Sequence, residues 1–214
     1  MHIITSDSSF PSPESATDDG LLAIGGDLTT ERLLLAYKNG IFPWFNDDEP
    51  ILWWCPDPRF ILIPSELKIS KSMRPVLNNG TFKFRVNTAF EEVINNCKNA
   101  NRKDQPGTWI TDEVREAFIN LHKCGYAVSA EAWKNGELAG GVYGVLLGKV
   151  FFEESMFSKQ PNASKFAFIS YIKYLQKQQV QLIDCQVYTS HLQTLGARMI
   201  ERENFLQLLT TLIS

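Results

Sequence analysis

Three polar side chains that could hold an amine or move a proton lie at the ends of apolar segments. Asp184 and Gln186 follow one short apolar run, and Glu154 follows another at residues 150–152. If the first pair lies on one strand, both side chains point to the same face and Cys185 points away. A carboxylate can attract a cationic amine, and an amide can accept a hydrogen bond from it. Taken alone, such a pair is more often a polar strand end, so both interpretations stay open.

Two tryptophans occupy positions where their rings could stack on a flat ligand. Trp44 follows a proline in an aromatic segment, and Trp109 precedes Thr111, which is a candidate N-cap. Stacking of a nucleobase on such a ring contributes about 1–3 kcal/mol and tolerates any sequence. An isolated tryptophan is more often a core residue. We expect Trp53 and Trp54 to pack between two parts of the chain.

The hydrophobic patterns after residue 62 predict the elements that position these side chains. Helical spacing and N-cap residues predict helices over 88–97, 111–125, 162–178 and 191–195. Strand patterns cover 82–86, 126–134, 137–146, 149–157 and 182–186. Asn135 and Gly136 give a strong hairpin signal, and Thr88 with Glu91 matches a capping box. The order predicts a mixed α/β (α+β) sheet domain and resembles that of the acetyltransferase-like (GNAT) fold.

The two ends of the chain differ in pattern. Residues 1–62 are interpreted as a small N-terminal domain that packs on a catalytic domain over residues 63–214. The first twenty residues carry two prolines, several serines and an acidic pair, and they are expected to form an extended arm. A short helix is predicted to open at Thr30 and to close at Gly40.

The composition is that of an ordinary globular protein. Of 214 residues, 44% are hydrophobic and 21% are charged. No apolar run reaches the roughly 18 residues that a membrane helix needs, and the N-terminus lacks the features of a signal peptide. The four cysteines lie far apart and histidines are few. We therefore expect no membrane association, no metal site, reduced thiols and a cytoplasmic location.

The net charge of −3 conceals an uneven distribution. Residues 1–60 hold three basic and ten acidic side chains, whereas residues 61–214 hold eighteen basic and fourteen acidic ones. Between residues 66 and 103, eight basic side chains outnumber three acidic ones. A local basic surface can bind phosphates whatever the total charge is. A solvated surface explains the same stretch, and taken alone it is the commoner explanation.

Eight segments occur in the order seen in the leucyl/phenylalanyl-tRNA–protein transferase family, which the chain resembles from about residue 20 to residue 206. They are 20–28 (GLLAIGGDL), 40–45 (GIFPWF), 50–59 (PILWWCPDPR), 107–111 (GTWIT), 154–158 (ESMFS), 162–165 (NASK), 183–186 (IDCQ) and 191–197 (HLQTLGA). Any one of these segments could match by chance. Eight in order over most of the chain make the resemblance highly specific.

The resemblance implies an aminoacyltransferase that moves Leu or Phe, and less readily Met, from aminoacyl-tRNA to a protein beginning with Arg or Lys. The product carries an N-end-rule degradation signal. The donor is an activated ester, so no ATP, metal or CoA is expected as a cofactor. Asp184, Gln186 and Glu154 are the candidate catalytic residues, with Gln186 orienting the amine because an amide is a very poor base. Trp44 and Trp109 are the candidates for binding the 3'-terminal adenosine of the tRNA.

The resemblance also implies which residues line an aminoacyl pocket. At Glu153 the chain departs from the family. By matching position, the pocket is lined by Val142, Phe151, Phe168, Tyr171 and Ile183. Two aromatic side chains three residues apart on one helix share a face, which predicts a narrow pocket that prefers Leu over Phe. The family usually has a small residue where this chain has Glu153. On a strand Glu153 points away from Glu154, so we expect it on the surface.

Two other classes of function stay open. An acyl-CoA-dependent GNAT N-acetyltransferase could use the same fold, but the turn over 158–162 contains no glycine to cradle a pyrophosphate. A non-catalytic module that binds tRNA or a peptide would need the tryptophans but not the three candidate catalytic residues. No interface pattern stands out, so a monomer is expected.

Overall fold

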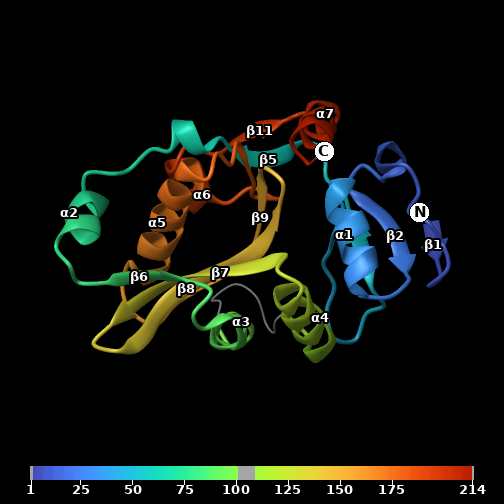
Figure 1. The fold of residues 1–214 in the computed structure, drawn as a ribbon. Helices are drawn as coiled ribbons and strands as arrows, with labels where there is room; N and C mark the ends of the chain where they lie inside the picture. The colour runs from blue at the N-terminus through green and yellow to red at the C-terminus, as the bar shows by residue number, and fades with distance from the viewer. Residues whose placement is uncertain (1, 101–108, 214) are drawn as a thin grey trace.

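The computed structural model describes residues 2–100 and 109–213 (Figure 1). A four-stranded sheet comes first in the chain, and its strands are β1 (His2–Ile4), β2 (Leu21–Gly25), β3 (Phe42–Pro43) and β4 (Leu52–Trp54). Their order is β1-β2-β4-β3, with β1 parallel to β2 and the other pairs antiparallel. A 3-10 turn, η1 (Pro13–Ser15), and helix α1 (Thr30–Lys38) complete this part.

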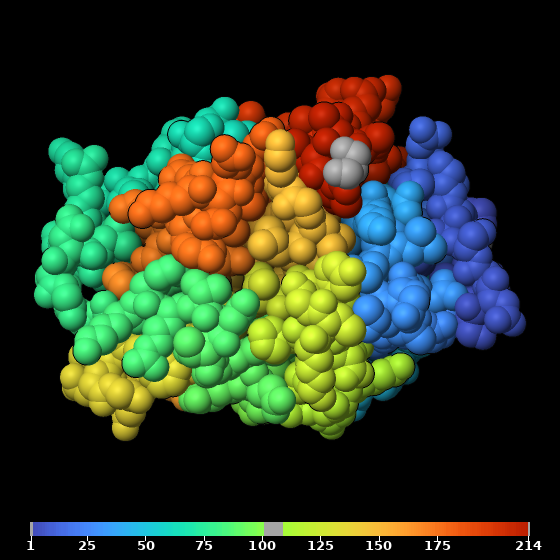
Figure 2. All heavy atoms as spheres, in the orientation of Figure 1, coloured from blue at the N-terminus to red at the C-terminus, as the bar shows by residue number. Residues whose placement is uncertain are grey.

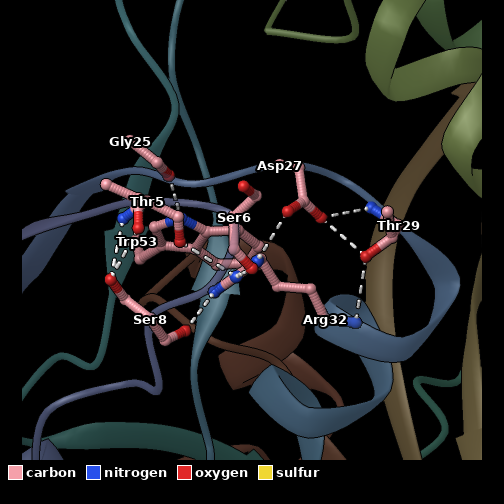
Figure 3. Close-up of polar contacts among 8 residues, drawn as sticks. All are labelled: Thr5, Ser6, Ser8, Gly25, Asp27, Thr29, Arg32 and Trp53. Carbon is pink, nitrogen blue, oxygen red and sulfur yellow. Dashed lines mark hydrogen bonds and ion pairs between the residues drawn. The ribbon is translucent and has the colours of Figure 1, made fainter.

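Arg32 of α1 holds the N-terminal segment against this sheet (Figure 3). Its guanidinium donates to the carbonyl oxygens of Thr5, Ser6 and Ser8 at 3.1, 2.6 and 3.1 Å, and to the Asp27 carboxylate at 3.2 Å. The side chain is 7% exposed, so these charge-assisted bonds form away from water. The expected extended arm is therefore corrected: this segment contains a paired strand and is anchored by a buried cation.

The larger sheet has seven strands. They are β5 (Arg59–Leu62), β6 (Lys83–Val86), β7 (Ala127–Lys134), β8 (Glu137–Leu147), β9 (Val150–Ser158), β10 (Leu182–Asp184) and β11 (Arg198–Ile200). Their order is β11-β5-β10-β9-β8-β7-β6, and β10 runs parallel to β9. The predicted hairpin is confirmed, because Asn135 and Gly136 join β7 to β8 with φ values of 52° and 86°. Although β5 lies within the predicted 1–62 domain, it is a strand of this larger sheet.

Helices cover both faces of the larger sheet, which confirms a mixed α/β architecture (Figure 1). The helices are α2 (Met73–Asn78), α3 (Phe90–Lys98), α4 (Asp112–Lys123), α5 (Ala163–Lys177), α6 (Ser190–Thr194) and α7 (Arg202–Leu212), with a 3-10 turn η2 (Pro64–Glu66). Neighbouring residues of β8 alternate between the faces as a strand requires. Val142 packs with Phe168 of α5, whereas Tyr143 packs on Phe118 of α4 with ring centroids 5.4 Å apart. Within the described ranges, no helix is long and apolar enough to cross a membrane.

One hydrophobic cluster joins the N-terminal sheet to the larger one. It contains Leu22 and Trp53 from the first sheet, Phe118 from α4 and Phe205 from α7. Figure 2 shows the residues of α1 lying against those of α4. Trp53 is fully buried and its Nε1 donates to the Gly25 carbonyl at 2.8 Å (Figure 3). Its ring also packs on Phe10 with centroids 4.8 Å apart. Both contacts lie within the N-terminal part, so packing between the two parts stays a prediction.

The start of α3 differs from the predicted capping box. The helix begins at Phe90, and its N-terminal segment is held by Glu131, on the neighbouring strand β7. The Glu131 carboxylate accepts the backbone N–H groups of Thr88 and Ala89 at 2.8 Å each. A distant residue therefore supplies the acceptor that a local glutamate was expected to provide, and the capping-box prediction is wrong.

Candidate active site

A cavity of about 380 Å³ lies where the first sheet meets the larger one. Its lining comes from residues 42–44, 153–156, 185–187, 189, 191 and 192 together with Trp109. A larger hollow of about 850 Å³ lies beside the ends of α5 and α7, but the side chains that line it carry no charge. Trp44, Glu154 and Gln186 all line the smaller cavity. The smaller cavity therefore brings these three candidate site residues together.

A β-bulge in β9 turns two adjacent glutamates into this cavity. The pairing of β9 with β8 shifts register beside Gly144, which pairs with Glu153 and leaves Glu154 as the extra residue. Glycine is required opposite the bulge, because a Cβ on Gly144 would collide with the backbone oxygen of Phe152. Glu153 and Glu154 are each 8% exposed, and both line the cavity. The expectation that Glu153 is a surface residue is wrong, because the bulge breaks the alternation of the strand.

Glu154 is only half satisfied by its surroundings. Its Oε1 accepts hydrogen bonds from the Tyr37 hydroxyl and from Nε2 of Gln186, each at 2.8 Å. Its Oε2 is buried and has no hydrogen-bond partner among the described residues. Burial raises the pKa of this carboxyl to about 8; the Tyr37 hydrogen bond opposes the rise and the charge of Glu153 adds to it. The site therefore contains a buried acid that titrates close to neutral pH and lacks one partner.

A buried ion pair fixes the segment that carries Gln186. The Nε and Nη2 atoms of Arg59 donate to the two carboxylate oxygens of Asp184 at 2.8 and 2.6 Å, and neither side chain is exposed. The backbone N–H of Gln186 donates to Asp184 Oδ1 at 2.9 Å. Asp184 therefore faces Arg59 and is not among the residues that line the cavity, whereas Gln186 is.

The strand predicted over 182–186 ends earlier than expected. β10 stops at Asp184, and Gln186 adopts φ 61°, in the left-handed region. That conformation costs a residue other than glycine roughly 1–2 kcal/mol, and such strain is concentrated at functional sites. The expectation that Asp184 and Gln186 share one strand face is therefore wrong, because the backbone turns between them and sends the amide alone into the cavity.

The two candidate tryptophans meet at this cavity. Trp44 follows β3 and is 39% exposed, and its ring packs on Trp54 with centroids 5.8 Å apart. Nε1 of Trp54 donates to the Trp44 carbonyl at 2.7 Å, which fixes the loop that carries Trp44. Trp109 precedes α4 and is 9% exposed. The Trp44 ring is thus open to a ligand, whereas the Trp109 ring is largely buried in the wall of the cavity.

The sequence matches two family models, leucyl/phenylalanyl-tRNA protein transferase over residues 61–210 and the N-terminal domain of that transferase over residues 26–57. A leucyl/phenylalanyl-tRNA–protein transferase of Flavobacterium johnsoniae is 56% identical over 98% of this chain and 99% of the relative. One of Flavobacterium psychrophilum is 54% identical over the same shares.

The chain belongs to this family. Among solved structures, a GCN5-related N-acetyltransferase from Kribbella flavida aligns at 10% identity with a TM-score of 0.38, over 78% of this chain and 59% of that chain. That likeness is too distant to refine the fold class.

The five residues matched to the aminoacyl pocket of the family lie in the hydrophobic cluster between α5 and the larger sheet. They are Val142, Phe151, Phe168, Tyr171 and Ile183, each at most 1% exposed. None of them is among the residues that line the cavity. The cluster and the cavity adjoin at Cys185 and Leu192, which belong to both. In this structure the space expected for an aminoacyl pocket is therefore occupied by the side chains of these five residues.

Two residues of the site were not predicted from the sequence. Tyr37 reaches Glu154 from α1, across the junction of the two sheets. Arg59 lies between the rings of Phe42 and Phe205, with its Cζ 4.7 and 4.6 Å from their centroids. Arg59 lies in the matched segment 50–59, so the family motif marked it without giving its role. Tyr37 lies outside every matched segment, and nothing in the sequence distinguished it from a core residue.

His191 is a third residue that sequence reasoning missed. It lines the cavity, and its Nε2 is buried without a hydrogen-bond partner in the part of the chain that the structure describes. Burial lowers the pKa of the imidazole, and the charge of Lys165 lowers it further, so the neutral ring is favoured. Its place in the matched segment 191–197 was the available signal.

Proposed function

We propose that this chain transfers Leu or Phe, and less readily Met, from aminoacyl-tRNA to the N-terminal Arg or Lys of an acceptor protein, which marks the acceptor for N-end-rule degradation. The observation that carries the proposal is the buried, unpartnered Oε2 of Glu154, in a cavity that also presents Gln186 and two tryptophans. A buried acceptor atom without a partner is costly. An incoming amine N–H supplies the missing bond.

The reaction needs no further reagent to balance. The α-amine of the acceptor attacks the ester carbonyl, the bond from that carbon to the ribose oxygen breaks, and the ribose oxygen takes a proton. An α-amine has an ordinary pKa of about 7.7–8.0, which matches the pKa of about 8 of Glu154. A base is most effective when its pKa lies near the working pH. Glu154 is therefore suited to take the proton of the α-ammonium group.

Gln186 and Asp184 have different tasks in this proposal. Gln186 donates its Nε2–H to Glu154, and its amide oxygen is the group that accepts a hydrogen bond from the attacking amine. An amide is a very poor base, so Gln186 orients the amine and does not deprotonate it. Asp184 is a positioning residue, because it binds Arg59 and the backbone N–H of Gln186 and does not reach the cavity.

The tRNA end is assigned to the rim of the cavity. The rings of Trp44 and Trp109 are proposed to hold the terminal adenosine, because stacking tolerates the shared 3' end of every tRNA. Of the basic stretch over 66–103, Lys98 pairs with Asp112 at 2.6 Å. The stretch also contains Arg102 and Lys103, which lie outside the described residues.

The donor side chain is proposed to enter the cluster between α5 and the larger sheet, beside Cys185 and Leu192. Phe168 and Tyr171 both pack in that cluster, so the space left for the donor is narrow. We expect faster transfer of Leu than of Phe, and equal rates from the two charged tRNAs would contradict this preference. Hydrophobic pockets discriminate by about 1–3 kcal/mol per methylene.

The finer architecture also belongs to this proposal. The order of α3, α4, β7, β8, β9, α5 and β10 supports a GNAT-like catalytic domain over 63–214. The small N-terminal domain proposed over 1–62 contributes its last strand, β5, to the sheet of that domain. The enzyme is expected to act as a monomer in the cytoplasm, without a cofactor.

The test is transfer of labelled Leu from charged tRNA to a peptide beginning with Arg, without ATP or CoA. Wild type should transfer Leu, and Gln186→Ala should reduce the rate by at least about tenfold, since a positioned hydrogen bond is lost. Asp184→Asn should also reduce it, whereas Gln178→Ala, an exposed glutamine at the end of α5, should not. Far-UV circular dichroism confirms folding of each variant. Acetylation of the peptide from acetyl-CoA without any Leu transfer would contradict the proposal.

A further inference from the structure

Tyr37 brings a hydroxyl group from helix α1, in the N-terminal part of the chain, to the carboxyl group of Glu154 on β9. Its side chain is fully buried, and its oxygen lies 2.8 Å from Oε1 of Glu154. The Tyr37 ring packs on Phe152 of the same strand with centroids 5.1 Å apart. Burial, with the charge of Glu154, raises the pKa of Tyr37 well above its ordinary value, so the hydroxyl keeps its proton. Tyr37 is therefore a fixed hydrogen-bond donor to Glu154.

The two oxygens of the Glu154 carboxyl group have different surroundings. Oε1 accepts hydrogen bonds from Tyr37 and from Nε2 of Gln186, whereas Oε2 has no partner among the described residues. The two donors come from different elements, one from α1 and one from the segment after β10. Rotation of the carboxyl group would break both bonds in a buried place, where lost hydrogen bonds cost most. The free acceptor positions therefore stay on Oε2.

Several neighbouring groups act on the charge of Glu154. Burial raises its pKa to about 8, the hydrogen bond from Tyr37 opposes the rise, and the charges of Glu153 and Asp184 add to it. Asp184 is itself paired with Arg59. The effect of Tyr37 is the largest of those that favour the charged carboxylate. The same hydroxyl therefore orients the carboxylate and helps to keep it ionised.

We propose that Tyr37 is a positioning residue of the transfer reaction, which holds the Glu154 carboxylate so that Oε2 stays free for the acceptor amine. This inference rests on the proposed transferase function. Because α1 lies outside the larger sheet, the N-terminal part of the chain completes the base that the larger sheet carries. The larger sheet alone would hold Glu154 by only one of its two donors.

The experiment removes the hydroxyl alone, in Tyr37→Phe, and measures both activity and the titration of Glu154. In free protein, followed by carbon-13 NMR, the Glu154 midpoint should rise by roughly one pH unit, because the lost bond favoured the charged form. At pH 8, kcat for Leu transfer should fall about 10- to 100-fold, while KM for charged tRNA changes less than about twofold. Tyr126→Phe removes the hydroxyl of an exposed tyrosine outside the cavity lining and should change none of these quantities.

A second variant moves the titration in the opposite direction. Replacement of Tyr37 by 3-fluorotyrosine makes the phenol more acidic and a stronger donor, so the Glu154 midpoint should fall below that of wild type. Thermal melts check that each variant is folded. A normal kcat in folded Tyr37→Phe would overturn this inference, and so would a lowered kcat with an unmoved midpoint, which a merely structural role predicts. Since the midpoint is measured without substrate, failure of the wild type to transfer Leu would separately overturn the proposed function.

Discussion

Two buried glutamates of the larger sheet, Glu131 and Glu154, differ in how completely their surroundings satisfy them. Glu131 on β7 is fully buried and accepts hydrogen bonds from the backbone N–H groups of Thr88 and Ala89 and from the side chains of Thr88, Ser129 and Trp133. Burial acts to raise its pKa, but the hydrogen bonds, led by that of Thr88, outweigh burial and lower it.

Glu154 on β9 has the opposite balance. One of its oxygens has two donors and the other has none, and burial raises its pKa to about 8. The fully satisfied carboxylate of Glu131 has a structural role, because it holds the segment that precedes α3. A carboxylate left unsatisfied beside a cavity is ready for a substrate. The difference lies in the donors around each group, since both are buried in one sheet.

The largest effect is expected from Glu131→Ala. Removing this carboxylate leaves its donors without an acceptor in a buried place, which should cost about 3–5 kcal/mol of unfolding free energy. The melting temperature should fall by roughly 10 °C. Urea unfolding followed by circular dichroism measures the loss. A loss below about 1 kcal/mol would mean that Glu131 is no more than an ordinary hydrogen-bonded side chain.

Glu154→Gln should show the reverse pattern. Removing the proposed base should slow Leu transfer by about 100-fold or more, while the melting temperature stays the same or rises. Glu113→Gln, an exposed glutamate of α4, is the control and should leave both quantities unchanged. A normal transfer rate in folded Glu154→Gln would remove Glu154 from the mechanism.

The pH dependence of the unfolding free energy should reveal the raised pKa of Glu154. A carboxyl whose pKa rises from 4.5 to about 8 on folding binds more protons in the folded protein between those values. Stability from this group is therefore present below about pH 4.5, decreases as the pH rises toward 8, and stays reduced above it. The unfolding free energy of wild type minus that of Glu154→Gln should fall between pH 5 and pH 8. A difference that is independent of pH would contradict the raised pKa.

A smaller effect is expected at the rim of the cavity. Trp44→Ala removes one stacking face and should raise KM for charged tRNA by about 5- to 100-fold, in line with about 1–3 kcal/mol per base. Tyr126→Ala removes a similarly exposed aromatic ring, 38% against 39%, away from the cavity lining, and should leave KM unchanged. Equal effects of the two substitutions would argue against a specific stacking role.

The sequence predicted five of the seven strands of the larger sheet, β6 to β10, because hydrophobic spacing and turn residues such as Asn135 and Gly136 are local signals. It did not predict β5 or β11. It failed where distant residues decide the structure. Glu131 replaced the local capping box at α3, and the bulge opposite Gly144 turned Glu153 into the cavity. Family resemblance brought Glu154 and Gln186 to notice. Tyr37, which donates to Glu154 from helix α1, has no local signal at all.

The most direct test is the titration of Glu154 itself, followed by carbon-13 NMR of glutamate-labelled protein and assigned by comparison with Glu154→Gln. Free protein should titrate with a midpoint near 8, as burial and the missing partner require. Addition of a peptide beginning with Arg should lower that midpoint, because a bound cation favours the charged carboxylate. A midpoint near the ordinary 4.5, unmoved by the peptide, would contradict the assignment of Glu154 as the group that receives the acceptor amine.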